Sequence, residues 1–387
     1  MSSRLMEPTP QKSIVMVAGE ASGDLHGAKV IHELRQLIGN PDVLGVGGRA
    51  MTRAGARIIC DNRDLAVVGV TEVLAKAPRI LRTLRRLKRL LARLRPDLLI
   101  LIDFPDFNLH LAAYAKKLNI PVLYYISPQI WAWRPGRVKK IKARVDHMAV
   151  ILPFEKDFYE KNDVPVTFVG HPLLDDHPAS LDLHHKGELD RPCIGLLPGS
   201  RDREVSRLLP PMLKAASLLS NRLAEAKFVV SCAPTIEKKM ITSQVSRHKM
   251  KNLEVSTAPI GDILERVDLV WAASGTVTLE AAIHATPMII IYTVSPLSHW
   301  LAKRLVRVDH IGLANLIAQK RIVPELVQSE VTPQRIAAET YLLLTDPMAF
   351  AGMRHALNAI RHQLGAVGAS KEVAKIAATL MEKAHAL

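Results

Sequence analysis

The sequence has few cysteines, no long apolar run and no secretory signal, and each of these absences excludes a class of protein. Only three cysteines occur in 387 residues, at Cys60, Cys193 and Cys232, and they form no paired motif. This usage fits a reducing compartment and argues against a disulfide framework or a thiolate zinc site. No apolar run reaches the roughly 18 to 20 residues that a membrane-spanning helix needs. Residues 1–12 lack the apolar segment of a secretory signal and are expected to form a disordered leader.

Aromatic residues are also scarce, at 4% of the chain, although 48% of all residues are hydrophobic. Four Trp and six Tyr provide few stacking platforms for single-stranded nucleic acid, and no zinc-finger or RNA-recognition signature occurs. The net charge of +15 nevertheless requires an anionic partner. A phosphorylated substrate or an anionic membrane face is therefore favoured, and we expect no nucleic-acid partner.

Strand-length apolar runs alternate with helical patterns along most of the chain. This alternation predicts an α/β fold with parallel sheets. A polar, proline-containing stretch at 175–192 interrupts the alternation before it restarts. We therefore expect a first domain at 13–175, a second domain at 190–345 and C-terminal helices at 346–387.

The first predicted strand, 13–18, leads into a loop and helix that carry Gly19, Gly23 and Gly27. This spacing differs from the G-x-G-x-x-G of a dinucleotide site. The next strand, 43–46, ends in glycines instead of the acidic residue that would hold an NAD ribose. A nicotinamide-dependent dehydrogenase is therefore disfavoured, and the loop is either a tight turn or a ligand loop.

The stretch 268–292, DLVWAASGTVTLEAAIHATPMIIIY, predicts a strand, a sharp turn, a helix and a strand. A helix that begins at Ser274, Gly275 and Thr276 points free N–H groups and its positive dipole end at the turn, which favours phosphate. Glu280 follows four residues after Thr276 on the same helical face, where a carboxylate can hold a ribose diol. The stretch predicts a nucleotide site; an ordinary capped helix with a solvated glutamate is the alternative.

Two further strand ends carry candidate functional residues. After the strand at 194–197, Gly199 and Ser200 precede a helix, and Arg201 can form a fork on a phosphate or pair with Glu204. After the strand at 97–103 come Asp106 and Asn108, at the sheet edge where open α/β folds bind ligands. Asp106 could equally be only the N-cap of the following helix.

Residues 77–95 predict an amphipathic helix with an unusually basic outer face. One stripe is apolar: Ile80, Leu84, Leu87, Leu91 and Leu94. Another face is basic: Arg82, Arg86, Arg89 and Arg93. The helix either packs on the core with a solvated basic face or lies on a membrane surface. In the second case Leu81 and Leu90, which lie off the main stripe, are expected to meet lipid.

In a set of motifs the chain resembles the lipid-A-disaccharide synthases, a family of B-type glycosyltransferases. The matching segments are AGEASGD (18–24), GVGG (45–48), IDFPDFN (102–108), SPQIWAW (127–133), PFEKDFYEK (153–161), FVGHPL (168–173), LLPGSR (196–201), SGTVTLEAA (274–282), ANLIA (314–318) and VPELVQ (323–328). Ala314 and Gln129 depart from the family pattern, which affects the expected shape of two loops. Residues 1–12 lie outside the resemblance.

The resemblance implies an architecture and a reaction. Two Rossmann-like domains would face a common cleft in the GT-B arrangement, with the last helices returning to the first domain. The enzyme would be an inverting hexosyltransferase that moves 2,3-diacylglucosamine from UDP-2,3-diacylglucosamine to 2,3-diacylglucosamine 1-phosphate (lipid X). The products would be a β-1,6-linked lipid A disaccharide 1-phosphate and UDP. The protein would act in the cytoplasm, peripherally on the inner face of the cytoplasmic membrane; a homodimer is left open.

The resemblance also assigns residues. Asp106 corresponds to the family's PDFN carboxylate and is expected to be the catalytic base in the first domain. Residues 199–201, 274–276 and Glu280 would bind UDP in the second domain, and Asn315 would orient the donor. The loops around acceptor and donor would contain Glu20, Ser22 and Asn108. The sequence has no D-x-D pattern, so we expect no catalytic metal and no other cofactor.

Three alternatives stay open at this point. A UDP-N-acetylglucosamine 2-epimerase-like enzyme would share the fold and a similar nucleotide site, but it would act on one soluble substrate. A transferase with a polyprenyl-linked acceptor would differ only in its lipid substrate. A basic nucleic-acid-binding scaffold would bind DNA or RNA with a steep salt dependence and would not bind UDP.

Overall fold

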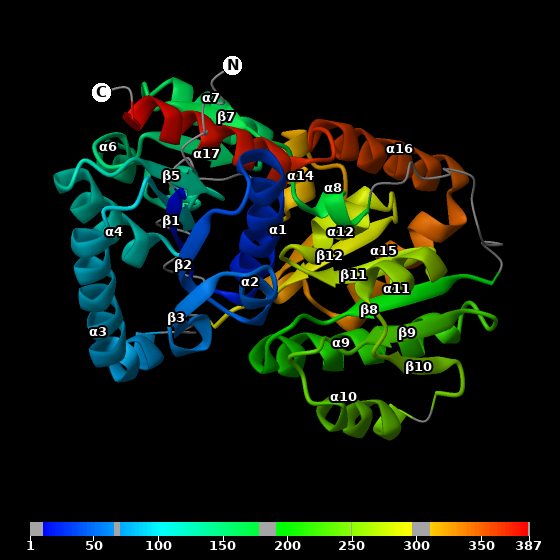
Figure 1. Cartoon of the computed structure of the whole chain (residues 1–387). Coiled ribbons are helices and arrows are strands. Elements are labelled where there is room, and N and C mark those ends of the chain that lie inside the picture. Colours follow the sequence, from blue (N-terminus) through cyan, green and yellow to red (C-terminus); the bar gives the residue numbers. More distant parts are fainter. Residues whose placement is uncertain (1–10, 66–69, 178–190, 249, 296–309, 386–387) are drawn as a thin grey trace, which may run out of the picture. The chain divides into compact units, whose positions relative to one another are not determined.

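The computed structural model describes residues 11–65, 70–177, 191–248, 250–295 and 310–385. The chain divides into a first unit, Met1–Asp176 with Gly365–Leu387, and a second unit, His177–Leu364. Each unit is built on one parallel sheet with helices around it (Figure 1). The predicted α/β class is confirmed. The predicted leader, 1–12, lies outside the described residues except for its last two positions.

The sheet of the first unit has seven strands in the order β3-β2-β1-β4-β5-β6-β7, and its described pairings are parallel. The strands are Ser13–Ala18 (β1), Asp42–Gly47 (β2), Arg57–Asp61 (β3), Leu98–Ile102 (β4), Val122–Tyr125 (β5), His147–Val150 (β6) and Val166–Phe168 (β7). Most are short apolar runs because both faces of a parallel sheet are covered. In β1, Val15 and Val17 enter one core cluster, whereas Ile14 and Met16 enter the other.

Helices cover both faces of this sheet. They are Ala21–Ile38 (α1), Arg49–Arg53 (α2), Val70–Leu94 (α3), Pro105–Lys117 (α4), Ile130–Trp133 (α5), Val138–Lys142 (α6), Pro153–Glu160 (α7), Leu173–Asp176 (α8) and Ala369–His385 (α17). Helices α1 and α17 contribute Leu34 and Ala377 to the core on one face. Helices α3 and α4 contribute Leu87 and Leu111 to the core on the other face.

The sheet of the second unit has six strands in the order β10-β9-β8-β11-β12-β13. They are Cys193–Leu197 (β8), Lys227–Ser231 (β9), Leu253–Ser256 (β10), Leu269–Ala273 (β11), Met288–Tyr292 (β12) and Glu325–Val327 (β13). The helices are Asp202–Ser220 (α9), Lys238–Val245 (α10), Ile260–Arg266 (α11), Val277–Ile283 (α12), Leu313–Ala318 (α14), Pro333–Thr345 (α15) and Pro347–Gln363 (α16). The described strand pairings are again parallel.

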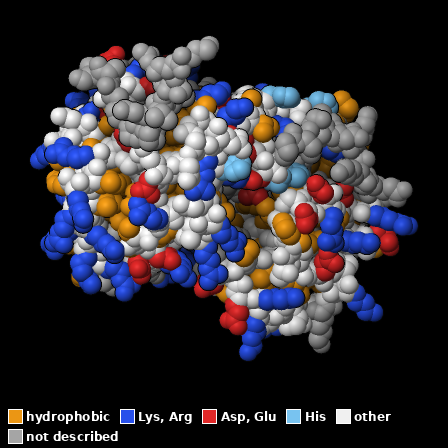
Figure 2. Space-filling model, in the orientation of Figure 1, with side chains coloured by type: hydrophobic (Ala, Val, Ile, Leu, Met, Phe, Trp, Pro, Cys, Tyr) orange, Lys and Arg blue, Asp and Glu red, His pale blue; other side chains and the backbone are white. Residues whose placement is uncertain are grey.

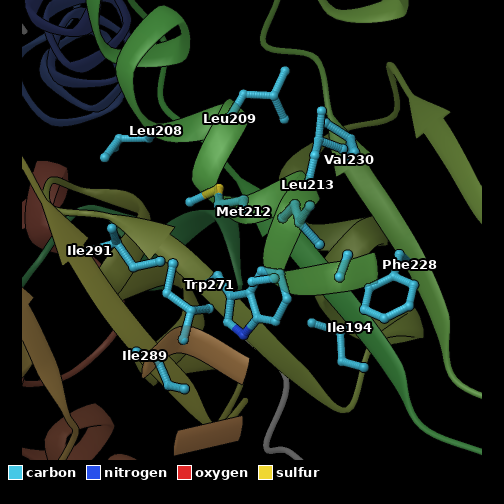
Figure 3. Close-up of a cluster of buried hydrophobic side chains, with 14 of the residues drawn as sticks. Ile194, Leu208, Leu209, Met212, Leu213, Phe228, Val230, Trp271, Ile289 and Ile291 are labelled. Atoms are coloured by element: carbon cyan, nitrogen blue, oxygen red, sulfur yellow. The ribbon is translucent and has the colours of Figure 1, made fainter. Parts of the chain in front are cut away.

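Trp271 of β11 is the largest fully buried side chain among the residues that the structure describes. Figure 3 shows its ring among Met212 and Leu213 of α9 and Ile289 of β12. Its Nε1 donates a hydrogen bond of 2.8 Å to Oγ1 of Thr340 in α15, so the polar edge of the ring is satisfied although it is buried. The packing of α9 and α15 on the sheet therefore depends on this residue.

The predicted C-terminal segment, 346–387, is divided between the two units. Helix α16 follows α15 without a linker, since Asp346 caps α16 by accepting from the N–H groups of Met348 and Ala349. It packs on α12 and stays with the second unit, whereas α17 packs on α1 in the first unit. The change of unit falls at Gly365, not at residue 346. Gly365 has φ +93 and its Cβ position lies 3.1 Å from the Cα of Gly170, so the chain returns to the first unit through a close-packed glycine.

Two sequence motifs near the amino end meet in one structural contact. The Asp24 carboxylate, at the end of AGEASGD, accepts from the backbone N–H groups of Gly48 (2.6 Å), Ala50 (2.9 Å) and Met51 (3.1 Å). It thereby satisfies the free donors at the start of α2, directly after GVGG. This aspartate is a structural residue of the first unit.

Gly45 in GVGG leads to a test of the fold. A Cβ at this position would lie 1.8 Å from the backbone oxygen of Met16 in β1, and its φ of +154 is one that other residues rarely adopt. We predict that Gly45→Ala lowers the free energy of unfolding by about 3 kcal/mol or more, as large overpacking does. The control is Gly136→Ala, where no atom lies within 4 Å of the added Cβ. Urea denaturation should show a change below about 0.5 kcal/mol for this control; equal stabilities for both variants would contradict the prediction.

Candidate active site

Two loops of the first unit meet where the strand order reverses. The loop after β1 contains Gly19 and Glu20, and the loop after β4 contains Asp103 and Phe104. A Cβ on Gly19 would lie 2.4 Å from the Phe104 ring, so only glycine permits this approach. Glu20 and Ser22 are exposed. The Glu20 carbonyl accepts from Asn62 Nδ2 at 3.1 Å, which fixes the loop after β1 from a third segment.

The turn after β4 has an unusual backbone. Asp103 and Phe104 both have left-handed conformations, with φ of +46 and +48. This strain is held by two donors to the Asp103 carbonyl, Tyr124 Oη and Asn108 Nδ2, each at 2.6 Å. Strained backbone of this kind persists only where the surroundings determine it, and it is concentrated at functional sites.

Asn108 was expected in the loops around acceptor and donor, and the structure places it elsewhere. Its side chain is completely buried, and its amide nitrogen donates to the carbonyls of Ile102 and Asp103. It therefore holds the turn after β4 from behind and has no accessible surface for a substrate. Asn108 is buried because it lies on the side of α4 that faces the sheet.

The Asp103 carboxyl is a candidate that the sequence reasoning missed. Burial raises its pKa to about 6, the charge of Glu20 contributes in the same direction, and the Phe104 N–H opposes both. A carboxyl with a pKa near 6 can accept a proton efficiently close to neutral pH. The sequence signal was an acidic residue at the end of an otherwise apolar predicted strand.

Asp106 lies in the first turn of α4, and its side chain is 76% exposed. The N-cap position of α4 is Phe104, so Asp106 does not have the capping role that was its alternative interpretation. Its Oδ1 accepts from Arg137 Nη2 at 2.7 Å. Asp106 is thus an accessible carboxylate held by an arginine from the segment after β5.

A second buried carboxyl, Glu155, supports that segment. Its Oε1 accepts from Trp131 Nε1 at 3.1 Å, and its Oε2 accepts from the Leu152 N–H at 3.2 Å. Trp131 also meets the Phe154 ring edge-on, at a centroid distance of 4.7 Å. Burial raises the pKa of Glu155 to about 7, against the opposing effect of these hydrogen bonds. The sequence offered one weak signal, an acid three residues after Leu152, at the third helical position of α7.

In the second unit, the corresponding reversal of strand order lies between β8 and β11. Gly199 follows β8 with φ +113. The N–H of Ser200 donates to Glu204 Oε2 at 3.3 Å, and Arg201 Nη1 donates to Glu204 Oε1 at 2.9 Å. Arg201 therefore forms the ion pair with Glu204 that the sequence offered as the alternative to phosphate binding. Its side chain remains 64% exposed, and a guanidinium has five donors, so this pair leaves donors for a phosphate.

The loop after β11 lies beside the loop after β8, because β8 and β11 are hydrogen-bonded neighbours. Gly275 and Thr276 are exposed, Ser274 and Glu280 are half-buried, and Thr276 is the N-cap of α12 without a side-chain cap bond. Ser274 Oγ donates to the carbonyl of Ile311 at 3.3 Å. The start of α12 is thus open to solvent.

Asn315 also differs from its predicted role. It was expected to orient the donor, but it is fully buried and its amide group is saturated. Nδ2 donates to the Val323 carbonyl (3.0 Å) and to Glu325 Oε1 (2.7 Å), while Oδ1 accepts from the N–H groups of Ile322 (2.8 Å) and Val323 (3.0 Å). An asparagine side chain has no further hydrogen-bonding capacity. Asn315 therefore fixes α14 to the segment before β13 and does not reach a ligand.

The outer face of α3 has the predicted basic character. Arg82, Arg86, Arg89 and Arg93 are all exposed, and Figure 2 shows Lys and Arg side chains gathered where Figure 1 places α3. Leu81 is 50% exposed, as expected. Leu90 was also expected to face outward, but it is half-buried and packs against the core of the first unit. It directly precedes the buried Leu91 and follows Leu87 by one turn, so it lies at the edge of the buried stripe.

The comparisons with known proteins agree with this geometry. The model of the family "Lipid-A-disaccharide synthetase" matches residues 14–379. A lipid-A-disaccharide synthase of Geobacter metallireducens is 45% identical over 98% of this chain and 100% of its own length, and that of Trichlorobacter lovleyi is 45% identical over 96% and 98%. This chain belongs to the lipid-A-disaccharide synthase family. The resemblance seen in the sequence motifs is confirmed.

Solved structures place the family member among the GT-B proteins by fold. The glycotransferase of kitacinnamycin has a TM-score of 0.62 at 16% identity and covers 96% of this chain, which covers 100% of that protein. The UDP-GlcNAc 2-epimerase of Neisseria meningitidis bound to UDP-GlcNAc has a TM-score of 0.59 at 11% identity, with coverages of 96% and 100%. The epimerase alternative is thus a likeness of fold alone. The family match decides in favour of a glycosyltransferase.

The buried Glu155 leads to a pH-dependent prediction. Because its pKa is raised in the fold, its contribution to stability is complete below the unfolded value, about 4.5, and is lost as the pH rises through about 7. Trp131 and Leu152 donate to different oxygens of Glu155, and Glu155→Gln replaces one of these oxygens with an NH2 group that cannot accept, so the variant should be less stable than the parent at pH 5. The difference should shrink by up to about 3 kcal/mol by pH 8.

The measurement is a series of urea denaturations of both proteins at pH 5, 6, 7 and 8. The control is Glu160→Gln, which removes a carboxylate from the exposed end of the same helix. A stability difference between Glu155→Gln and the parent that stays constant over this range would show that Glu155 does not titrate there.

Proposed function

We propose that this chain transfers 2,3-diacylglucosamine from UDP-2,3-diacylglucosamine to the 6-hydroxyl of 2,3-diacylglucosamine 1-phosphate, with inversion at the anomeric carbon. The products are the β-1,6-linked disaccharide 1-phosphate and UDP. The observation that carries the proposal is the family match over residues 14–379, which includes the candidate loops of both units. The lipid-A-disaccharide synthase of Geobacter metallireducens, 45% identical at nearly full length, supports the same assignment.

The donor site of the proposal lies in the second unit. The leaving diphosphate needs positive charge and N–H donors, which Gly199, Ser200 and Arg201 and the start of α12 at 274–276 would supply. Glu280, one turn into α12, would hold the ribose hydroxyls. Among the described residues, no cluster of three or more His, Cys, Asp or Glu side chains has the arrangement of a metal site. The solved epimerase that carries UDP-GlcNAc has this fold, which supports a nucleotide site of the same type.

The chemistry of the proposal is a single displacement. A base removes the proton of the acceptor hydroxyl, its oxygen forms a bond to the anomeric carbon, and the bond to UDP breaks with its electron pair on the diphosphate. Asp106 is the proposed base because it is accessible and its carboxylate is held by Arg137. Asp103 is the second candidate because its carboxyl has a pKa of about 6 in a strained turn.

The experiment that tests the reaction is incubation of the protein with both diacyl substrates, followed by mass spectrometry and NMR of the product. We expect a β-linked disaccharide 1-phosphate and one UDP for each disaccharide. An epimerised UDP-sugar that forms without acceptor would instead support the epimerase alternative. A transferase with another lipid acceptor would release UDP only with that acceptor.

Asparagine variants distinguish the two candidate bases. Asp106→Asn keeps the shape of the side chain but cannot accept a proton, so kcat should fall about 10²-fold or more, with unchanged UDP affinity. Near-normal turnover in this variant would exclude Asp106 as the base. If a comparable loss then appeared in Asp103→Asn, with an acid limb near pH 6 in the kcat/KM profile of the parent, the base would be Asp103.

The proposal includes peripheral binding to the inner face of the cytoplasmic membrane. Both proposed substrates carry acyl chains, and no described helix has the length and apolar content of a membrane span. The basic face of α3 supports surface binding, since each Arg near an anionic leaflet contributes about 1 kcal/mol before screening. With Leu90 packed inward, Leu81 is the described leucine of α3 best placed to enter the lipid interface. The homodimer stays a prediction that light scattering would decide.

Replacement of the four α3 arginines tests the membrane proposal. The variant Arg82→Gln, Arg86→Gln, Arg89→Gln and Arg93→Gln should sediment less with anionic liposomes and act more slowly on membrane-presented acceptor. Its rate on detergent-dispersed acceptor and its UDP affinity should change little. The matched control removes the same charge from exposed residues of the second unit: Lys214, Lys238, Lys239 and Lys251. Equal liposome binding by both variants and the parent would leave α3 with only a solvated basic face.

A further inference from the structure

We propose that Arg134 and Arg137, arranged around the Trp133 ring, form the binding site for the phosphate of the acceptor. This inference rests on the proposed function, because it names how the acceptor would be recognised beside the proposed base. The site lies within the first unit, on the segment formed by α5 and the 3-10 turn Pro135–Arg137. Neither arginine belonged to the sites expected from the sequence.

The first observation is the exposed aromatic ring. Trp133 is 40% exposed, whereas its neighbour Ala132 in α5 is buried. The Arg134 guanidinium lies over the Trp133 ring, with Cζ 4.1 Å from the ring centroid, and Arg137 Cζ lies at 5.8 Å. An indole face attracts cations, and it also offers apolar area to the body of a ligand. One ring therefore holds two positive charges at the surface of the first unit.

The second observation is the charge balance of this group. Arg137 donates to Asp106, so its charge is compensated by that carboxylate. Among the residues that the structure describes, no carboxylate partner is found for Arg134, whose guanidinium lies over the Trp133 ring. Two guanidinium groups beside one carboxylate leave a net positive charge that an anion can neutralise. Arg137 has five N–H donors, so it can hold Asp106 and a phosphate oxygen together.

The third observation is that the segment that contains Trp133 is held in place by contacts with α7. Trp131, two residues before Trp133, donates to the buried Glu155, and it packs against Phe154. A second internal bond, between Ser127 Oγ and Tyr159 Oη at 2.8 Å, ties the residues before α5 to the same helix α7. A binding group held in this way loses little freedom when a ligand binds, which favours affinity.

The arrangement fits a phosphomonoester attached to an amphipathic body. A dianionic phosphate would accept from both guanidinium groups, and the attached sugar would lie against the Trp133 ring. Asp106, joined to Arg137 at 2.7 Å, would then face another position of the same sugar. The acceptor of the proposed reaction has these two parts, a phosphate at one end of the ring and a reacting hydroxyl at the other. A membrane phospholipid would offer a similar phosphate, so the experiment separates these two sources.

The decisive experiment compares two acceptors dispersed in detergent, 2,3-diacylglucosamine 1-phosphate and 2,3-diacylglucosamine. In the parent protein we expect a higher kcat/KM for the phosphorylated acceptor. Arg134→Gln should lower this preference about 10- to 100-fold, the size of a lost charge-assisted contact, and should change the rate on the unphosphorylated acceptor by less than about threefold. Arg53→Gln removes an exposed arginine of α2 and is the matched control, for which the preference should stay the same.

Each other outcome has a defined meaning. An equal loss on both acceptors, or no loss on either, would overturn the phosphate assignment. Weaker sedimentation of Arg134→Gln with anionic liposomes, with an unchanged preference between acceptors, would assign these arginines to the lipid headgroups and would also overturn it. Normal turnover of the unphosphorylated acceptor shows that the variant is folded.

A binding measurement separates the failure of this inference from the failure of the proposed function. If the parent forms no disaccharide from either acceptor, the proposed reaction is wrong. Calorimetry with glucosamine 1-phosphate and with glucosamine needs no turnover. We expect the parent to bind the phosphorylated sugar more tightly and Arg134→Gln to lose this difference. Binding of glucosamine 1-phosphate that is equal in both proteins would contradict the assigned site even if the enzyme is active.

Discussion

In each unit the strand order reverses once, between β1 and β4 in the first sheet and between β8 and β11 in the second. The chain builds one half of each sheet outward and then returns to begin the other half beside its first strand. The loops after the two central strands therefore lie next to each other at the carboxyl edge, where open parallel sheets bind ligands. Glu20 and Asp103 meet at the first reversal, and the segments 199–201 and 274–276 meet at the second.

Charged groups at both reversals are already paired within the protein. Arg137 holds Asp106, and Arg201 holds Glu204. Each pair has one largely exposed partner, Asp106 in the first and Arg201 in the second, and an ion pair that is open to solvent in this way contributes little to stability. A phosphate group can therefore recruit the remaining donors of these arginines at small cost. The carboxyls of Asp103 and Glu155 differ from these exposed pairs. Burial raises their pKa values to about 6 and about 7, so their charge changes near neutral pH.

The sequence predicted the central strands of both sheets and the main helices, because apolar period is a local property. It did not predict the strands Arg57–Asp61 (β3) and Glu325–Val327 (β13). It also did not predict which polar side chains form all their hydrogen bonds within the protein and are therefore not available to a ligand. Asn108 and Asn315 belong to conspicuous motifs, yet their amides are bonded to backbone and side-chain groups brought near by packing. Leu90 is drawn inward by its position beside Leu91. The raised pKa values of Asp103 and Glu155 come from burial by other segments, which no local pattern expresses.

In the proposed reaction the two reversals bind different substrates, the nucleotide in the second unit and the acceptor in the first. Hydrogen–deuterium exchange with and without UDP tests this most directly, because it reports on each loop separately. We expect UDP to slow exchange in peptides covering 198–204 and 273–280, and glucosamine 1-phosphate to slow exchange in peptides covering 103–108 and 130–137. Protection by UDP confined to the loops of the first unit would contradict this assignment of substrates.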